Sequence, residues 1–173
     1  MRLFHVSEEA NIQVFEPRIP ARKDLDHNIG LVWAIDEERL PNFLTPRNCP
    51  RVAYHAGNQT STYDKRRFFT SESTEYVVVI EKTWFDIMRK TTLYLYEFNT
   101  DDFVLQDEVA GYYVSAKTQH PVKQYVIKDL FGELLKRNVE VCICDNLWDI
   151  ADAVKVSTLN WSLCRMANAL PRY

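Results

Sequence analysis

The 173-residue sequence contains only four glycines, and none of them belongs to a phosphate-binding motif. Neither G-x-G-x-x-G nor G-x-x-x-x-G-K-[ST] occurs, which argues against Rossmann-type and P-loop functions. The zinc-protease pattern H-E-x-x-H and the nucleophile-elbow pattern G-x-S-x-G are absent too. These absences argue against the enzyme classes that use those motifs, so any function must be inferred from the polar residues that are present.

No apolar stretch approaches the roughly 20 residues that a membrane-spanning helix needs. The formal net charge is -3, which lacks the dense positive field of a sequence-independent nucleic-acid binder. The acidic residues Glu8 and Glu9 come before any sustained apolar region, so no secretory signal is expected. We therefore expect a cytoplasmic protein with no membrane partner and no strong nucleic-acid signal.

Cysteine is sparse as well, with four residues at positions 49, 142, 144 and 164. In V-E-V-C-I-C-D, Cys142 and Cys144 alternate with apolar residues and are expected on one face of a strand. A C-x-C pair supplies only two of the four ligands that structural zinc normally takes. We predict four free thiols and no bound metal.

Apolar patterns predict most of the secondary structure. The strongest strand is E-Y-V-V-V-I-E at 75–81, because four β-branched residues follow one another. Amphipathic spacing predicts helices at 82–90 and 128–138. The segment 146–170 is expected to be mostly helical, with the β-branched V-K-V-S-T at 154–158 as a place where it can break in two. Ser7, followed by acidic residues, favours a short helical turn at 7–15. Further strands are expected at 2–6, 31–36, 51–57, 91–98, 101–106, 111–116, 119–127 and 139–145.

Strands and helices do not alternate regularly, and no internal repeat or linker interrupts the chain. This order is typical of an α+β protein rather than of a doubly wound α/β fold. We predict one domain over residues 1–173, built on a strongly bent, mixed or mainly antiparallel sheet with flanking helices. The polar stretch 16–30 contains two prolines and a glycine and is long enough for a lid or a substrate-facing loop.

Two arginines bracket a cysteine in T-P-R-N-C-P-R, where prolines restrict the turn. The guanidinium groups of Arg47 and Arg51 suit bidentate binding of phosphate or carboxylate. The alternative is that both pair with acidic residues such as Glu8 or Asp36 and hold loops together. Cys49 lies near these cations but has no adjacent base in the sequence, which argues against a nucleophilic role.

His5 stands in the first predicted strand, R-L-F-H-V, directly before a polar stretch that begins at Ser7. Proteins commonly place their sites where a regular element ends in a loop. A neutral imidazole donates from one nitrogen and accepts at the other, which suits contact with ribose hydroxyls. Arg18 in F-E-P-R and Ser115 in G-Y-Y-V-S-A are further polar candidates. The alternative for His5 is a half-buried structural side chain.

Five segments carry a resemblance that extends over nearly the whole chain: L-F-H-V-S-E-E-A-N-I-Q-V-F-E-P-R, L-V-W-A-I-D, T-P-R-N-C-P-R, G-Y-Y-V-S-A and S-L-C-R-M-A-N-A. Together they resemble a small family of bacterial intracellular proteins known only as a domain of unknown function. This resemblance implies a bacterial origin and marks the same polar segments, without an assigned activity.

A more distant resemblance lies in R-L-F-H-V-S-E-E, in N-I-G-L-V-W-A-I-D and in G-Y-Y-V-S-A-K-T-Q-H-P-V-K-Q-Y-V-I. These segments are similar to three motifs of the ADP-ribosyltransferase-like fold, in which a first-strand histidine contacts the nicotinamide ribose of NAD. Of the mapped residues, His5 matches. Val6 stands in place of a glycine, Val32 in place of a tyrosine, and Gln124 in place of a catalytic glutamate.

Two functional hypotheses follow, with a purely structural role for the arginines as a third. The first is an ADP-ribosyltransferase-like protein that binds a nucleotide, with NAD as the candidate cofactor and His5 in the catalytic position. The second is a non-catalytic module whose arginines bind a small anionic ligand or partner. Both place five residues in a common cleft: His5, Arg18, Arg47, Arg51 and Ser115.

Overall fold

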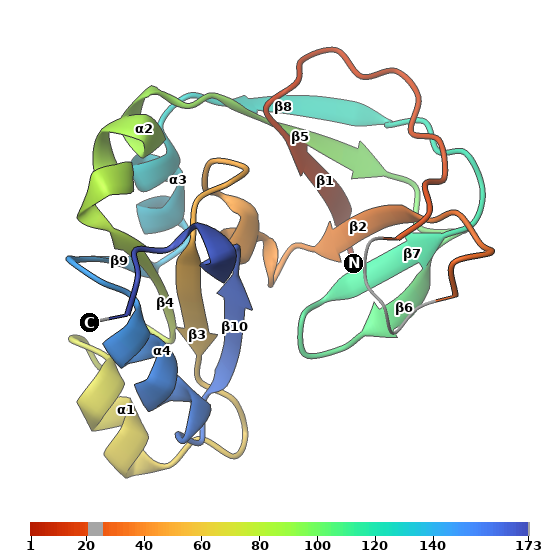
Figure 1. Ribbon diagram of the computed structural model, residues 1–173. Coiled ribbons are helices and arrows are strands. Elements are labelled where there is room, and N and C mark those ends of the chain that lie inside the picture. The colour runs from red at the N-terminus through yellow and green to blue at the C-terminus, as the bar shows by residue number, and fades with distance from the viewer. Residues whose placement is uncertain (21–25, 173) are drawn as a thin grey trace. The chain divides into compact units, whose positions relative to one another are not determined.

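The computed structural model describes residues 1–20 and 26–172, and it divides into two compact units. Unit 1 comprises Met1–Leu40 and Leu93–Ile127, and unit 2 comprises Pro41–Thr92 and Lys128–Tyr173. Each unit is built around its own β-sheet (Figure 1).

Unit 1 contains a six-stranded sheet in which all neighbouring strands are antiparallel. Its strands are β1 (Leu3–Ser7), β2 (Val32–Asp36), β5 (Leu93–Phe98), β6 (Val104–Asp107), β7 (Tyr112–Ser115) and β8 (Lys123–Ile127). They follow one another across the sheet in the order β6-β7-β2-β1-β5-β8. The first strand of the chain therefore lies inside the sheet, with β2 on one side and β5 on the other.

Side chains of β1 alternate between the two faces of this sheet. Leu3, His5 and Ser7 project from one face, which we call the His5 face, and Phe4 and Val6 project from the other. A buried apolar cluster contains the β1 residue Leu3 together with residues of neighbouring elements: Val32, Ala34, Tyr96, Phe98 and Phe103. Because Ile12 and Phe15 pack against this cluster, the stretch after β1 covers part of the His5 face.

Unit 2 contains a four-stranded sheet that mixes antiparallel and parallel pairs. Its strands are β3 (Arg51–His55), β4 (Tyr76–Glu81), β9 (Val139–Cys144) and β10 (Asn160–Cys164). They lie in the order β10-β3-β4-β9, with β4 and β9 parallel and the other pairs antiparallel. The strand β4 is confirmed where the β-branched run predicted it, and the four residues of that run are all buried.

Four short α-helices belong to unit 2: α1 (Thr62–Phe68), α2 (Phe85–Lys90), α3 (Leu130–Lys136) and α4 (Trp148–Lys155). Three single 3-10 turns are η1 (Leu40–Phe43), η2 (Lys82–Trp84) and η3 (Met166–Asn168). Two helices begin at capping side chains that satisfy otherwise unpaired backbone amides. Ser61 accepts from the amide of Asp64 at the start of α1, and Asp129 accepts from the amide of Gly132 at the start of α3.

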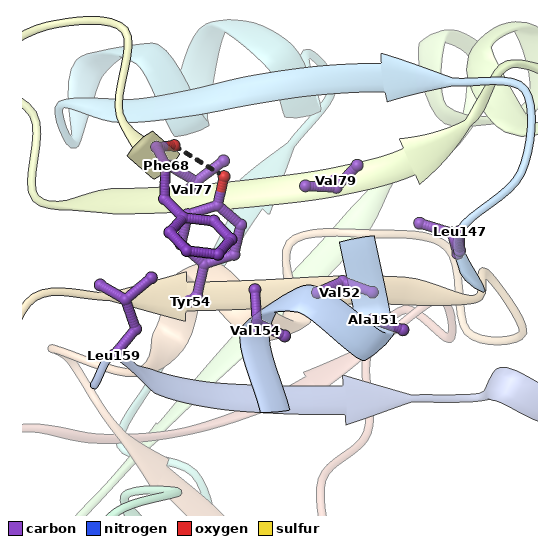
Figure 2. Close-up of a cluster of buried hydrophobic side chains, with 9 residues drawn as sticks. All are labelled: Val52, Tyr54, Phe68, Val77, Val79, Leu147, Ala151, Val154 and Leu159. Atoms are coloured by element: carbon purple, nitrogen blue, oxygen red, sulfur yellow. Dashed lines mark hydrogen bonds between the residues drawn. The ribbon is translucent and has the colours of Figure 1, made fainter. Parts of the chain in front are cut away.

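Helices α1 and α4 contribute to one apolar core of unit 2 (Figure 2). Ala151 and Val154 of α4 are buried with Val52 and Val79 of the sheet. The hydroxyl of Tyr54, also in this core, donates to the carbonyl of Phe68 at 2.9 Å. This bond satisfies the one polar atom of the Tyr54 side chain, and it ties the end of α1 to the sheet.

The predicted α+β class and the predominance of antiparallel pairing are confirmed, although the strands form two sheets and not one bent sheet. The single domain over 1–173 stays a prediction, since two compact units can belong to one folding domain or to two. In the described residues 1–20 and 26–172, no helix is long and apolar enough to cross a membrane.

Two local expectations were wrong. The segment 146–170 is not mostly helical: α4 ends at Lys155, inside the β-branched stretch 154–158, and only the 3-10 turn η3 follows later. Between them Asn160–Cys164 pairs with β3 along its whole length. The stretch 7–15 does not form a helical turn, and Asn11 adopts a left-handed conformation with φ of 60°. Residues 21–25 of the predicted lid lie outside the described residues, so the lid stays a prediction.

Candidate functional site

His5 lies in a row of side chains that crosses the six-stranded sheet of unit 1. It pairs directly with Tyr96 of β5, and Tyr96 pairs with Gln124 of β8. On the other side of β1, Phe4 pairs with Ile35 of β2, and the neighbouring Ala34 pairs with Tyr113 of β7. Residues directly opposite one another on adjacent strands project from the same face. The imidazole, the phenol and the amide of Gln124 therefore belong to the His5 face.

The orientation of the His5 ring is set by a hydrogen bond to the backbone. Its Nδ1 lies 3.0 Å from the carbonyl oxygen of Trp33. A carbonyl only accepts, so Nδ1 carries the proton and donates, and in the neutral ring Nε2 is then the acceptor. The ring also packs against Phe15, with 4.9 Å between ring centres. The half-buried imidazole is thus held in one tautomer and one orientation.

The stretch after β1 is fastened to this row through its backbone. The hydroxyl of Tyr96 donates to the carbonyl of Glu9 at 2.6 Å and accepts from the amide of Ile12 at 3.1 Å. The amide of Asn11 donates to Oε1 of Gln124 at 3.2 Å. Tyr96 and Gln124 therefore anchor residues 9–12, and the sequence patterns did not identify this role.

Ser115 is buried at the end of β7 and supports the same region. Its hydroxyl oxygen accepts from Nε2 of Gln119 at 2.9 Å and from the amide of Lys117 at 3.2 Å. The backbone of Gln119 in turn forms two hydrogen bonds with Phe15, the residue that packs on His5. The hydroxyl of Ser115 therefore stabilises the loop at 117–119. That Ser115 also contacts a ligand stays a prediction.

Arg18 is exposed, and its backbone exchanges two hydrogen bonds with Leu31, at 3.1 and 2.8 Å. Leu31 directly precedes β2, the strand next to β1 in the sheet. Arg18 thus belongs to unit 1 together with His5 and Ser115.

The two arginines of T-P-R-N-C-P-R belong to unit 2 and have different environments. Arg51 is only 4% exposed, and it donates to the carbonyls of Asn42 at 2.6 Å and Cys49 at 3.0 Å. These contacts give Arg51 a structural role, although its partners are backbone carbonyls and the structural alternative named acidic side chains. Arg47 is exposed in a turn that the Cys49 amide closes onto the carbonyl of Pro46. The common cleft draws residues from both units, and it stays a prediction.

The cysteines are free, as the sequence predicted. Burial raises the pKa of the Cys49 thiol to about 12, against a smaller opposing effect of Arg51. Burial likewise raises the pKa of Cys142 to about 12, with the Glu140 carboxylate contributing. A thiol that stays protonated at neutral pH is a poor nucleophile and a poor metal ligand. In the part of the chain that the structure describes, no group of three or more potential ligands is arranged to hold a metal ion.

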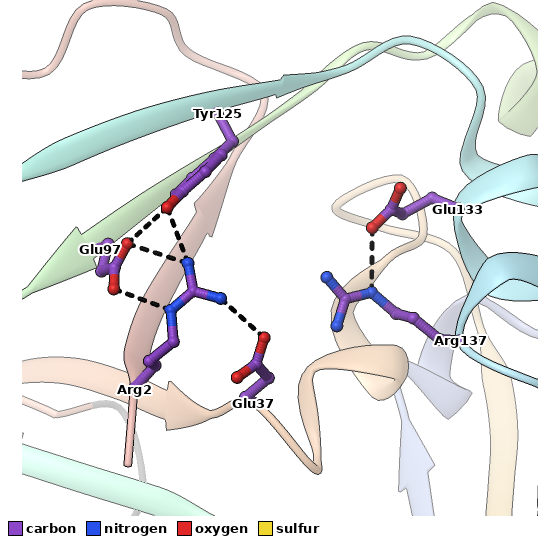
Figure 3. Close-up of polar contacts among 6 residues, drawn as sticks. All are labelled: Arg2, Glu37, Glu97, Tyr125, Glu133 and Arg137. Carbon is purple, nitrogen blue, oxygen red and sulfur yellow. Dashed lines mark hydrogen bonds and ion pairs between the residues drawn. The ribbon is translucent and has the colours of Figure 1, made fainter.

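A polar cluster on the opposite face of the unit 1 sheet had no signal in the sequence patterns (Figure 3). Arg2 donates to both carboxylate oxygens of Glu97, at 2.8 and 3.0 Å, and to Glu37 at 2.8 Å. The hydroxyl of Tyr125 donates to Glu97 at 2.7 Å. These hydrogen bonds, led by that from Arg2, lower the pKa of Glu97 to about 2. The cluster joins Arg2, directly before β1, to β5 and β8 and is a structural feature of the sheet.

The structure is that of an α+β protein in which His5, Tyr96 and Gln124 form one row across an antiparallel sheet. A family model described as a family of unknown function (DUF6886) matches residues 4–169. The match covers nearly the whole chain, so the protein belongs to this family, in agreement with the first resemblance. None of the curated proteins and none of the solved structures compared with the chain matches it.

Proposed function

We propose that the protein binds a nucleotide at the His5 face of unit 1, with NAD as the candidate ligand. The observation that carries this proposal is the register, which aligns His5 with Gln124 across Tyr96. The three segments that resemble the ADP-ribosyltransferase-like fold contribute β1, β2, β7 and β8 to one sheet. Segments so far apart in the sequence can form one ligand site only if the fold brings them together, and a common sheet does so.

The chemistry of His5 supports contact with a ribose. Its Nδ1 donates to the Trp33 carbonyl, so Nε2 of the neutral ring is an acceptor, which is the chemistry that contact with a ribose hydroxyl needs. The proposal is for binding and does not include transfer. Gln124 is uncharged, and its Oε1 accepts from the amide of Asn11, so it does not supply the negative charge that stabilises an oxocarbenium-like state.

The positions of the arginines give the anion-binding alternative less support than the register gives the nucleotide proposal. Arg51 is buried and donates to backbone carbonyls, which leaves Arg18 and Arg47 as its exposed candidates. This alternative predicts that inorganic phosphate stabilises the protein as well as NAD does.

Thermal denaturation in the presence of NAD, ADP-ribose or phosphate tests the proposal, because a ligand that binds only the folded state raises the melting temperature. We expect saturable stabilisation by NAD and ADP-ribose, and its loss in His5→Ala. The matched control is His120→Ala, since His120 is an exposed histidine of the same unit whose Nδ1 lies 3.1 Å from the Gln13 carbonyl oxygen.

A second variant separates binding from folding. In His5→Asn the side-chain amide can still donate to the Trp33 carbonyl, but the Nε2 acceptor is lost. We expect its melting temperature without ligand to stay close to that of the wild type, and NAD stabilisation to disappear. NAD stabilisation that persists in His5→Asn and His5→Ala would refute the role of His5, and equal effects of NAD and phosphate would favour the alternative.

A further inference from the structure

The last described residues of unit 2 run along the start of α4, and side chains bind their backbone. Glu81 at the end of β4 accepts from the amide of Leu170, at 3.1 and 3.2 Å. Trp148 donates from Nε1 to the carbonyl of Leu170 at 2.7 Å, and Asn146 donates to the carbonyl of Pro171 at 2.9 Å. Proline has no amide hydrogen. Every backbone hydrogen-bonding group of this dipeptide is therefore bound by a side chain.

The next residue, Arg172, is recognised through its side chain. Its guanidinium donates two hydrogen bonds to Asp152, at 2.6 and 3.0 Å, and lies 4.2 Å from the ring centre of Trp148. Trp148 and Asp152 are four residues apart in α4, so they lie on the same side of the helix. A carboxylate beside an aromatic face matches the planar, forked guanidinium better than it matches an ammonium group.

We propose that Glu81, Asn146, Trp148 and Asp152 form a peptide-binding strip for an extended aliphatic-Pro-Arg segment of a partner protein. In this structure the chain's own Leu170–Arg172 occupies the strip as an intramolecular competitor. The geometry is that of peptide recognition, in which the receptor reads the backbone and one anchoring side chain.

Two observations separate the occupant from the core of unit 2. All three of its residues are exposed, including the apolar Leu170, so a competing peptide can displace it without opening the core. The four residues of the strip lie within the family match at 4–169, whereas the occupant begins at residue 170.

Space for a longer partner adjoins the strip. A pocket of about 510 Å³ is lined by Asn146, which belongs to the strip, and by Asp145, Asp149 and Ile150 among others. Asp145 is already paired with Lys82, so Asp149 is the pocket carboxylate that complements a partner of positive charge.

The test uses the full chain with Arg172→Ala, which weakens the internal competitor and leaves the strip intact. The probe is the peptide acetyl-Ala-Leu-Pro-Arg-amide, with acetyl-Ala-Leu-Pro-Ala-amide as the control. The readout is the indole N–H resonance of Trp148 in NMR spectra, assigned by its loss in Trp148→Phe. The matched control protein is Arg66→Ala, which removes an exposed arginine of α1 in the same unit.

We expect Arg172→Ala to shift the Trp148 resonance and the Pro-Arg peptide to reverse this shift saturably. Millimolar peptide is required in this experiment, because a tethered segment competes at an effective concentration in that range. The Pro-Ala peptide, and the Pro-Arg peptide added to Asp152→Ala/Arg172→Ala, should bind about tenfold more weakly or worse. The wild type and Arg66→Ala should show little response.

Three outcomes would overturn the proposal. The first is a Trp148 resonance that Arg172→Ala leaves unchanged. The second is equal binding of the Pro-Arg and Pro-Ala peptides, because the contacts of Arg172 with Asp152 and Trp148 would then not be specific recognition of arginine. The third is a concentration-dependent dimer in sedimentation that Asp152→Ala abolishes, because the occupant would then be a second copy of this chain.

Discussion

Replacing Glu97 with Gln should destabilise the protein at neutral pH and remove part of its acid sensitivity. The carboxylate of Glu97 accepts two hydrogen bonds from Arg2 and one from Tyr125. Gln keeps the size of the side chain and one acceptor oxygen but removes the negative charge. The variant therefore tests the charge of the cluster while the packing of the sheet is preserved.

The magnitude follows from the pKa of Glu97, which lies at about 2 against an ordinary value of 4.5. At about 1.4 kcal/mol for each tenfold change in proton affinity, this difference corresponds to at most about 3–4 kcal/mol. The Arg2 side chain is 41% exposed, so water screens the pair, and we expect about 1–2 kcal/mol. The raised pKa of Arg2 reflects the same interaction and is not counted again.

The pH dependence has a definite sign. A carboxyl group with a lowered pKa in the folded state contributes stability above its unfolded value, here about 4.5, and that contribution is lost as the pH falls toward 2. Urea unfolding at a series of pH values should show the wild type above Glu97→Gln at neutral pH and the two converging in acid. Glu108→Gln, at an exposed position of the same unit, is the control. A constant gap between wild type and Glu97→Gln down to acid pH would refute the electrostatic reasoning.

Three further predictions concern unit 2. Arg51→Ala should lower the free energy of unfolding by about 2–4 kcal/mol, because it leaves two buried carbonyls without donors. Arg47→Ala should change it by no more than about 0.5 kcal/mol. A larger loss in Arg47→Ala than in Arg51→Ala, measured by urea unfolding, would contradict the assigned contacts. Tyr54→Phe should cost about 1–2 kcal/mol in the same assay through loss of the bond to Phe68, and an unchanged stability would argue against that bond. Thiol titration without reductant should find four thiols after unfolding and slow reaction of Cys49 before it, and fewer than four would indicate oxidation or metal binding.

Local patterns located most strands because each of those strands carries its own signal. The buried run of β4 is β-branched throughout, and such residues favour strands wherever they are packed. The strand β10 was missed because N-W-S-L-C has no such run and follows directly on a helical pattern. Its assignment depends on pairing with β3, which lies far away in the sequence. The division of the strands between two sheets is likewise a matter of long-range pairing.

The candidate site was predictable only in part for the same reason. The position of His5 inside a strand could be read from R-L-F-H-V, but its neighbours Tyr96 and Gln124 depend on the register of three strands. A shift of one residue in either pairing would move a neighbour to the opposite face. The burial of Arg51 depends in the same way on the pairing of β3 with β4 and β10.

The polar residues of unit 1 that lie near His5 all form hydrogen bonds with the backbone of loops. Tyr96, Gln124 and Ser115 all bind the backbone of loops, so their polar atoms have structural partners. His5 binds a backbone carbonyl in the same way, through Nδ1, and in the neutral ring its Nε2 is an acceptor. The structural and the ligand-binding interpretations of His5 therefore agree on Nδ1 and differ on Nε2. A variant that keeps a donor near Nδ1 and removes the Nε2 acceptor distinguishes them, whereas truncation to alanine removes both contacts at once.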